Sequence, residues 1–215
     1  MTAERRYVMN NKAMYKLSYG LFILSARDGE KDNACIINTA IQAALEPNQM
    51  SICVNKENYT HDMILKTGKF TVSVLSQSAS FDLFKRFGFS SGRDTDKFDG
   101  FNNVKRNADG LYYITESTNA YISVDVTDTV DLGSHTMFIG KVTDIDVLSD
   151  EPSVTYEYYF ENIKPKPQAV GTTPKGETVW RCIICGYEYV GEELPDDYIC
   201  PLCKHPASDF EKIVR

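Results

Sequence analysis

The sequence lacks the features of nucleic-acid-binding, membrane-spanning and secreted proteins. Basic charge is not in excess, since the formal net charge is −7, and binding to nucleic acid needs a surface that neutralises phosphates. No apolar run approaches the roughly 20 residues that cross a bilayer. The first residues are polar and contain no apolar segment of the kind found in signal peptides. We therefore expect a cytoplasmic protein that contacts neither nucleic acid nor membrane.

A disulfide framework is also not expected, because the cytosol keeps thiols reduced. The six cysteines are unevenly placed. Four of them form two Cys-x-x-Cys pairs near the C terminus, namely Cys182, Cys185, Cys200 and Cys203. Each pair brings two thiolates onto one turn, and two facing turns make a tetrahedral site of four sulfurs. The spacing predicts a metal centre, and such a site suits either iron or zinc.

The chain divides near residue 175. Residues 163–176 contain three prolines and two glycines and have no hydrophobic period, as is typical of a linker. We predict domains at 1–162 and 177–215, joined by this linker. The second domain is too small to fold on apolar burial alone, so it needs a metal or cross-links. A flexible linker predicts a module that moves relative to the first domain; a rigidly docked module is the alternative.

Hydrophobic alternation predicts mostly strands before the linker. We expect strands near residues 20–26, 34–41, 50–54, 70–75, 120–126 and 136–142, and short helices over 7–18, 60–67 and 79–86. The tyrosine-rich run at 155–160 is interpreted as a packed strand, with an edge strand or a dimer contact as alternatives. Many strands with few helices indicate an antiparallel barrel, so the fold class is mainly β.

The C-terminal motifs resemble a rubredoxin. Trp180-Arg-Cys-Ile-Ile-Cys-Gly-Tyr is similar to the first rubredoxin knuckle, Leu194-Pro-Asp-Asp-Tyr-Ile-Cys-Pro-Leu-Cys to the second, and Asp209-Phe-Glu to the segment that closes the core. The resemblance implies one iron atom bound by the four cysteines. Lys204 stands where glycine is usual, and the stretch between the knuckles is short, as in rubredoxin modules fused to other enzymes. A structural zinc ribbon remains the alternative.

The first domain resembles the flavin reductase family, in its ferric-reductase-like branch. The similarity rests on five kinds of segment in order: 15–24, Asn38-Thr39, 54–61, the pair 85–88 and 97–100, and 133–140. It implies an FMN-binding split barrel of Greek-key type. Together with the rubredoxin motifs, it makes the whole chain similar to the high-molecular-weight rubredoxins of anaerobic bacteria.

Several polar residues are candidates for holding FMN. The segment Asn55-Lys-Glu-Asn-Tyr-Thr60 supplies a cation, amides and a hydroxyl just before a predicted helix, whose N terminus favours a phosphate. We expect Lys56, Asn58 and Thr60 to hold the phosphate. The resemblance adds Asn38, Thr39, Gln42 and Asn55 as cofactor-binding residues. An ordinary polar turn that caps the helix is the alternative for 55–60.

Two residues are candidates for catalysis. The resemblance places His135 near the flavin ring or the nicotinamide, and Cys53 near the flavin. A structural histidine and a buried strand thiol are the respective alternatives, and the sequence pattern does not distinguish them. Cys35 also stands in a hydrophobic run, which is typical of a buried, inert thiol.

The pairing of domains predicts a function. A nicotinamide gives up a hydride, whereas an iron–thiolate site accepts one electron, and a flavin converts between the two. We expect NADH or NADPH to reduce FMN, FMN to reduce the iron, and the iron to reduce a redox partner. The resemblance implies a flavodiiron protein as that partner, and a homodimeric barrel. A flavin or ferric reductase with a zinc ribbon, and a non-enzymatic electron carrier, are the alternatives.

Overall fold

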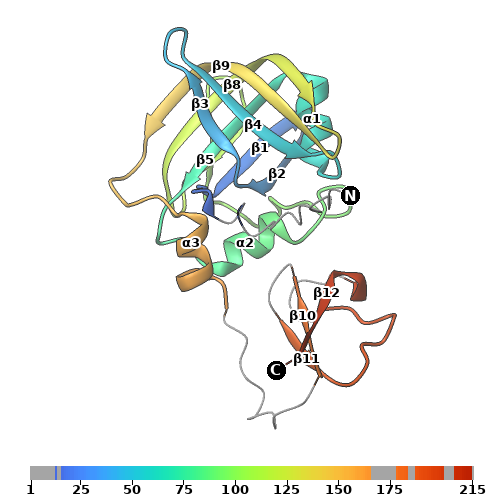
Figure 1. Ribbon diagram of the computed structural model, residues 1–215. Helices are drawn as coiled ribbons and strands as arrows, with labels where there is room; N and C mark the ends of the chain where they lie inside the picture. Colours follow the sequence, from blue (N-terminus) through green and yellow to red (C-terminus); the bar gives the residue numbers. More distant parts are fainter. Residues whose placement is uncertain (1–12, 14–15, 166–177, 184–186, 201–205, 215) are drawn as a thin grey trace, which may run out of the picture.

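The computed structural model describes residue 13 and residues 16–165, 178–183, 187–200 and 206–214. It has a seven-stranded antiparallel sheet and, near the C terminus, a separate three-stranded sheet (Figure 1). Most of the helix predicted over 7–18 and most of the predicted linker lie outside the described residues. The mainly β fold class is confirmed.

The large sheet has the strand order β2-β1-β5-β8-β9-β4-β3. Its strands are β1 (Phe22–Asp28), β2 (Lys31–Ile37), β3 (Ala40–Ala44), β4 (Gln49–Asn55), β5 (Lys69–Leu75), β8 (Thr118–Asp131) and β9 (His135–Val147). The other elements of this part are the hairpin β6 (Val104–Arg106) and β7 (Tyr112–Ile114), and the helices α1 (Tyr59–Thr67), α2 (Phe81–Gly88) and α3 (Tyr156–Tyr158). Every paired strand runs antiparallel to its neighbour.

The barrel is split between two strands that follow each other in the chain. β2 and β3 are the first and last strands of the sheet order, and only Asn38 and Thr39 separate them. The single strand predicted over 34–41 is therefore wrong, because the chain leaves one edge of the sheet at Ile37 and joins the other at Ala40. The break places two polar residues at the mouth of the barrel.

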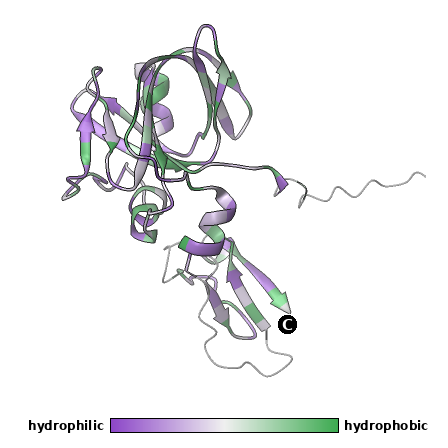
Figure 2. Cartoon of the chain, turned by 90° about the vertical axis from the view of Figure 1, so that its left-hand side faces the viewer, coloured by the Kyte–Doolittle hydropathy of each residue, from purple (hydrophilic) through white to green (hydrophobic). Residues whose placement is uncertain are grey.

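Alternation along the strands builds two cores. In β1, Leu24 belongs to the cluster inside the barrel, whereas Ile23 belongs to the cluster that α2 and α3 cover. Both side chains are fully buried. Successive strand residues point to opposite faces of a sheet, so one strand contributes to both cores. Figure 2 shows the corresponding changes between hydrophobic and hydrophilic residues along single strands.

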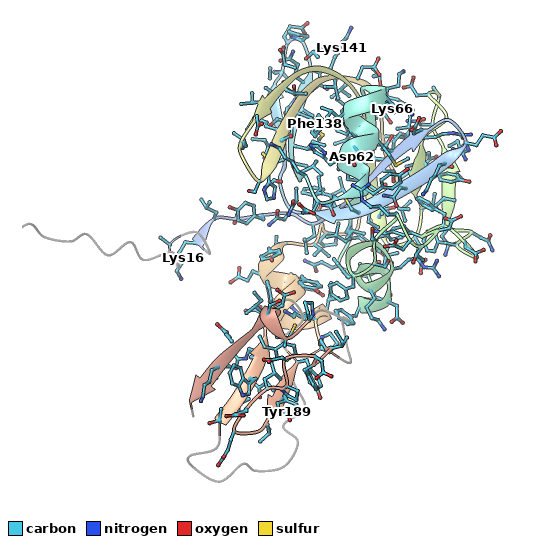
Figure 3. All side chains as sticks on the ribbon, turned by 90° about the vertical axis from the view of Figure 1, so that its right-hand side faces the viewer. Lys16, Asp62, Lys66, Phe138, Lys141 and Tyr189 are labelled. Carbon is cyan, nitrogen blue, oxygen red and sulfur yellow. The ribbon has the colours of Figure 1, made fainter. Side chains whose placement is uncertain are left out.

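Helix α1 closes one end of the inner core. Met63 and Ile64 are buried in the cluster inside the barrel, where Phe138 also lies. Asp62 in the first turn and Lys66 in the last turn match the helix dipole. The helix ends at Gly68, whose φ of 70° suits glycine and lets its N–H bond the Ile64 carbonyl. Asp62 and Lys66 lie on the outer side of the helix (Figure 3).

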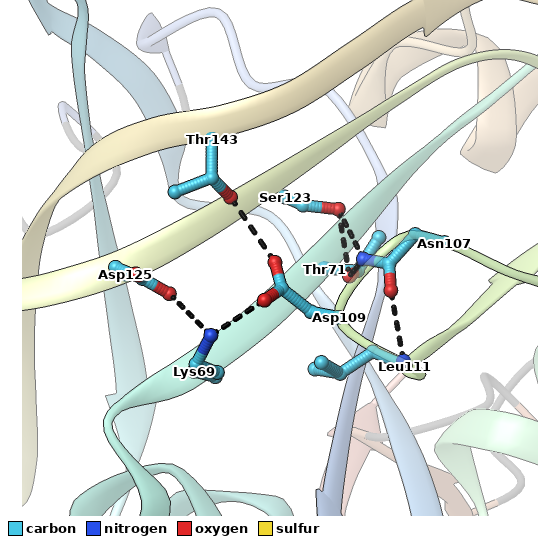
Figure 4. A network of polar contacts seen from close by, with 8 residues as sticks. All are labelled: Lys69, Thr71, Asn107, Asp109, Leu111, Ser123, Asp125 and Thr143. Atoms are coloured by element: carbon cyan, nitrogen blue, oxygen red, sulfur yellow. Dashed lines mark hydrogen bonds and ion pairs between the residues drawn. The ribbon is translucent and has the colours of Figure 1, made fainter.

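A polar network attaches the β6–β7 hairpin to the barrel (Figure 4). The Asn107 amide donates to Ser123 Oγ and Thr71 Oγ1, and its carbonyl accepts the Leu111 N–H. Lys69 lies between the carboxylates of Asp109 and Asp125. The hairpin loop is thereby fixed to β5 and β8 on the outer face.

The tyrosine-rich run is helical, and its prediction as a strand is wrong. α3 continues into a wider turn over Tyr159–Ile163. The Thr155 hydroxyl caps the helix by accepting the Tyr158 N–H at 3.1 Å. Tyr159 packs on Phe84 of α2, with ring centroids 4.5 Å apart. Contact with α2 therefore outweighs the strand propensity of tyrosine.

The C-terminal module contains β10 (Thr178–Cys182), β11 (Glu188–Val190) and β12 (Phe210–Val214), in the order β11-β10-β12. Its small core consists of Cys182, Cys200 and Phe210. Aromatic rings cover this core, including Trp180, Tyr187, Tyr189 and Tyr198. The aromatic residues of the rubredoxin-like motifs, Trp180, Tyr187, Tyr198 and Phe210, thus gather in one core.

Candidate functional site

A cavity of about 190 Å³ opens at the split of the barrel. It is lined by Ile36, Ile37, Asn38, Thr39, Cys53, Asn55, Asn58 and His135. The strand register explains the grouping, because Asn55 pairs with His135 and Cys53 with Met137 across β4 and β9. The structure thereby brings together six predicted cofactor residues or catalytic candidates from three parts of the chain.

The junction residue Thr39 holds this cavity together. Its hydroxyl donates to the Cys53 carbonyl at 2.9 Å, and its own carbonyl accepts the Cys53 N–H at 3.2 Å. His135 Nδ1 lies 2.9 Å from Ser134 Oγ, which orients the imidazole. Partial burial raises the pKa of the Cys53 thiol, so Cys53 is a neutral thiol at neutral pH.

A second cavity, of about 210 Å³, lies at the N terminus of α1. Asn58, Tyr59 and Thr60 line it from the helix, and the loop after α2 contributes Ser90, Ser91 and Gly92. Asn58 is the N-cap residue, yet its side chain makes no capping hydrogen bond to the helix. A helix N terminus with hydroxyl groups around it is suited to a phosphate.

Buried polar groups form the floor of the second cavity. The Asn33 amide donates to Thr60 Oγ1 at 2.9 Å, and Thr60 also bonds the Cys35 thiol. Lys97 is only 5% exposed, and its Nζ donates to the carbonyls of Ala34 and Phe87. Burial lowers the pKa of Lys97 and raises that of Cys35. A buried ammonium beside a helix N terminus gives the cavity an anion-binding character.

The two cavities adjoin at Asn58, which lines both. Each is smaller than the roughly 300–1,000 Å³ of a typical ligand pocket, and together they reach that range. One end has helix N–H groups, hydroxyls and a cation, and the other has two isoleucines, a thiol and an imidazole together with amide and hydroxyl side chains. The joined cavities therefore suit a ligand with an anionic group at α1 and a ring at the split.

Lys56 and Gln42 do not line either cavity. Lys56 Nζ lies 2.7 Å from Asp131 Oδ1 on the surface. The Gln42 amide donates to Asn48 Oδ1 at 3.0 Å within the β3–β4 hairpin. His61, in contrast, is buried. Its two ring nitrogens form hydrogen bonds with Asp62 and Thr136. These polar contacts account for the three residues without a ligand.

Sequence reasoning missed Asn33, Lys97 and the serines of the loop after α2. Lys97 belongs to a segment that resembles the flavin reductase family, and its place before Phe-Asp-Gly was the one available signal. Asn33 lies 27 residues from Thr60 in the chain, so only the folded barrel relates them. Gly92 approaches Asn33 so closely that a Cβ would lie 2.0 Å from its Oδ1. The loop therefore needs glycine there.

The candidate metal centre is described at two of its four cysteines. Cys182 and Cys200, one from each knuckle, are both fully buried and share one cluster. Cys185 and Cys203 lie outside the described residues. The Cys182 N–H bonds the Tyr187 carbonyl at 2.8 Å, which tightens the first knuckle. Two buried thiols brought together from separate turns fit a thiolate-bound metal.

The fold agrees with comparisons to known proteins. Residues 14–166 match the flavin reductase like domain, and residues 180–211 match the rubredoxin-like domain of rubrerythrin. The chain belongs to the flavin reductase-like family. The second match places a rubredoxin-like domain after the flavin reductase-like one. The chain is thus an oxidoreductase with a flavin-binding domain and an iron-binding domain of the rubredoxin type.

Similar proteins share this organisation in whole or in part. High molecular weight rubredoxin of Moorella thermoacetica is 34% identical over 95% of this chain and all of that protein. Ferric-chelate reductase (NAD(P)H) of Archaeoglobus fulgidus is 36% identical over 80% of this chain and 98% of that protein. The resemblance to high-molecular-weight rubredoxins is confirmed.

Solved structures support the fold of the flavin reductase-like domain. The FMN-binding protein from Thermus thermophilus superposes with a TM-score of 0.63, covering 81% of this chain and all of that one at 19% identity. Among the described residues, no helix is both long and apolar enough to cross a membrane.

Proposed function

We propose that this protein carries FMN in the joined cavities and takes a hydride from NADH or NADPH. It then passes single electrons to iron in the C-terminal module, which reduces an external redox protein. The observation that carries the proposal is the occurrence on one chain of a flavin-type cavity and a thiolate centre. Flavin accepts a hydride and releases electrons singly, whereas an iron–thiolate centre accepts one at a time.

The residues of the barrel bind and orient the cofactor in this proposal. Asn58, Thr60 and the first N–H groups of α1 hold the phosphate, and the Lys97 ammonium adds positive charge behind them. Asn38, Thr39 and Asn55 flank the ring end. The sheet gives these groups a fixed geometry, so little reorganisation is needed when the cofactor binds.

We assign His135 and Cys53 to the ring end, where they face the reacting part of the cofactor. His135 supplies an imidazole that Ser134 orients. The Cys53 thiol is neutral and half-buried, so it limits water at the ring without adding charge. Excluding water protects a hydride donor and acceptor from side reactions.

Titration of the purified protein with NADH, without oxygen, tests this function. Visible spectra should show flavin and iron–thiolate bands, and NADH should bleach both. Flavin bands without iron absorption would favour the zinc ribbon. Both chromophores present but unchanged by NADH would favour an electron carrier without a nicotinamide site.

Ferric-chelate reduction is a second candidate, favoured by the identity to the Archaeoglobus ferric-chelate reductase. In that case the barrel passes electrons to an exogenous ferric complex, and the module is not needed. The variant Cys200→Ser separates the two functions. Chelate reduction that survives loss of the metal would support the barrel as the site, and its loss would support the module.

We further propose a homodimer and an acidic docking face for the partner, such as a flavodiiron protein. Ile41 and Leu45, on and just after the edge strand β3, are 65% and 80% exposed, and exposed apolar groups at a sheet edge are commonly covered. Residues 176–215 carry eight Asp or Glu against four Lys or Arg. That charge favours a partner with a basic surface.

A further inference from the structure

A third cavity lies between the barrel and the C-terminal module. It has a volume of about 300 Å³ and is lined mostly by apolar residues. Its barrel side consists of Leu21, Ile36, Phe84, Gly88, Phe89, Tyr156, Tyr159 and Phe160, and its module side is Ile183. We call this the α2–α3 groove. Figure 1 shows the module beside α2 and α3.

The groove shares its wall with the proposed flavin site. Gly88 and Phe89 line both the groove and the cavity at the α1 N terminus, and Ile36 lines both the groove and the cavity at the barrel split. A Cβ on Gly88 would lie 3.2 Å from the Ile36 side chain, so these two residues close the wall tightly. The module therefore contacts the barrel directly behind the proposed cofactor.

Phe89 connects the two domains. It packs against the module core of Cys182, Cys200 and Phe210, and its ring meets Phe81 edge-on at 5.7 Å. Ile183 follows the metal-ligating Cys182 and is held by a hydrogen bond from its N–H to the Asp209 carbonyl. The knuckle that holds the metal is thus the part of the module that faces the groove.

We propose that the module docks on its own barrel in the α2–α3 groove, through Ile183 of the module and Phe89 of the barrel. In this docked arrangement the flavin reduces the iron. The inference rests on the proposed function. In this step one electron leaves the reduced flavin and ferric iron becomes ferrous, and no bond is made or broken. The groove remains open, and Ile183 is 57% exposed in it. Such a limited contact suits reversible docking.

A photocross-link tests the pose independently of electron transfer. Phe160 lies in the groove and is 44% exposed, so replacing it with the photoreactive p-benzoylphenylalanine keeps an aromatic ring there. Irradiation of the full-length protein should join it to the peptide that contains Ile183, at the mass of one chain. No such adduct, or one at twice that mass, would overturn docking on the same chain.

Two matched variants complete the test. Ile183→Asp places a charge in the apolar groove, so it should abolish the cross-link and slow reduction of the iron by the flavin at least about tenfold. Ile199→Asp is the control, since Ile199 also adjoins a knuckle cysteine and is 52% exposed but does not line the groove. It should leave the cross-link and the rate unchanged.

The outcomes separate this inference from the proposed function. If Ile183→Asp loses the cross-link but the flavin still reduces the iron at the wild-type rate, docking in the groove is not needed for electron transfer. The proposed function would then remain intact. Iron that the wild-type flavin does not reduce would overturn the proposed function, whatever the cross-link shows. Phe89→Ser, on the barrel side, should reproduce the loss of rate with the module sequence unchanged; because Phe89 also lines the cavity at the α1 N terminus, its rate is measured on protein whose flavin absorption equals that of wild type.

Discussion

Replacing Thr60 with valine should weaken flavin binding far more than removing the Lys56 cation. Thr60 is completely buried and lines the cavity at the N terminus of α1. Valine keeps the shape and removes the hydroxyl. Loss of one hydrogen bond to a charged phosphate costs about 1.5–3 kcal/mol, or roughly a 10- to 150-fold rise in Kd.

Lys56→Ala should change the Kd by less than about fivefold. Lys56 is paired with Asp131 at the surface, and exposed ion pairs contribute at most about 1 kcal/mol. Thr60→Ser retains the hydroxyl and serves as the control for Thr60→Val. Fluorescence titration of flavin into the apoprotein measures all three affinities.

Thr60→Val should also lower the stability of the apoprotein. It leaves the Asn33 amide without its acceptor at 2.9 Å in a buried position, which costs about 1–3 kcal/mol. Thermal unfolding of the apoprotein measures this effect apart from flavin binding. Equal Kd values for Thr60→Val and wild type, or a larger effect from Lys56→Ala, would refute the placement of the phosphate at α1.

Four further outcomes are expected. Cys182→Ser should abolish or shift the iron absorption and keep bound flavin, whereas Cys35→Ser should keep both; stoichiometric zinc in protein from native cells would contradict an iron site. Asp62→Asn should lower the melting temperature at neutral pH. Hydrogen bonds with His61 and then Arg93 lower the pKa of the Asp62 carboxyl below its ordinary 3.8, so the ionised carboxylate stabilises the fold above that pH. The difference in melting temperature between the variant and wild type should vanish as the pH falls through the lowered pKa. Light scattering should give twice the 24.3 kDa chain mass, and Ile41→Glu with Leu45→Glu should give one chain mass. Electron transfer to an external acceptor should slow as ionic strength rises, because salt screens the acidic module; rates that are flat in salt would exclude steering.

The strands could be predicted because their hydrophobic alternation is local. β4, β5 and the first half of β8 coincide with hydrophobic runs of the sequence, and each of these strands has at least four buried residues. The break at Asn38 and Thr39 could not be predicted in this way. The residues on both sides of them have strand propensity. Only the curling of the sheet into a barrel makes the chain leave the edge strand β2 there and begin the opposite edge strand β3.

The candidate site was predictable where its residues are close in sequence. Asn58 and Thr60 precede a helix within one segment, and the cysteine pairs carry their own spacing. Asn33 looks like an ordinary turn residue in sequence, and Lys97 stands out only through its segment's resemblance to the flavin reductase family. Burial gives them their significance: Lys97 is enclosed with two carbonyl partners, and Asn33 reaches Thr60 only after β2 and α1 pack.

The split of the barrel explains why the site lies where it does. In a continuous antiparallel ladder, the backbone groups of neighbouring strands satisfy each other. Between β2 and β3 the ladder is interrupted, and Asn38 and Thr39 line a cavity at this break. Ile36, two residues before Asn38, lines this cavity and also the groove that faces the module. Ile36 therefore lies between the cavity at the split and the groove that faces the module, so a cofactor bound at the split would have the module on the other side of this side chain.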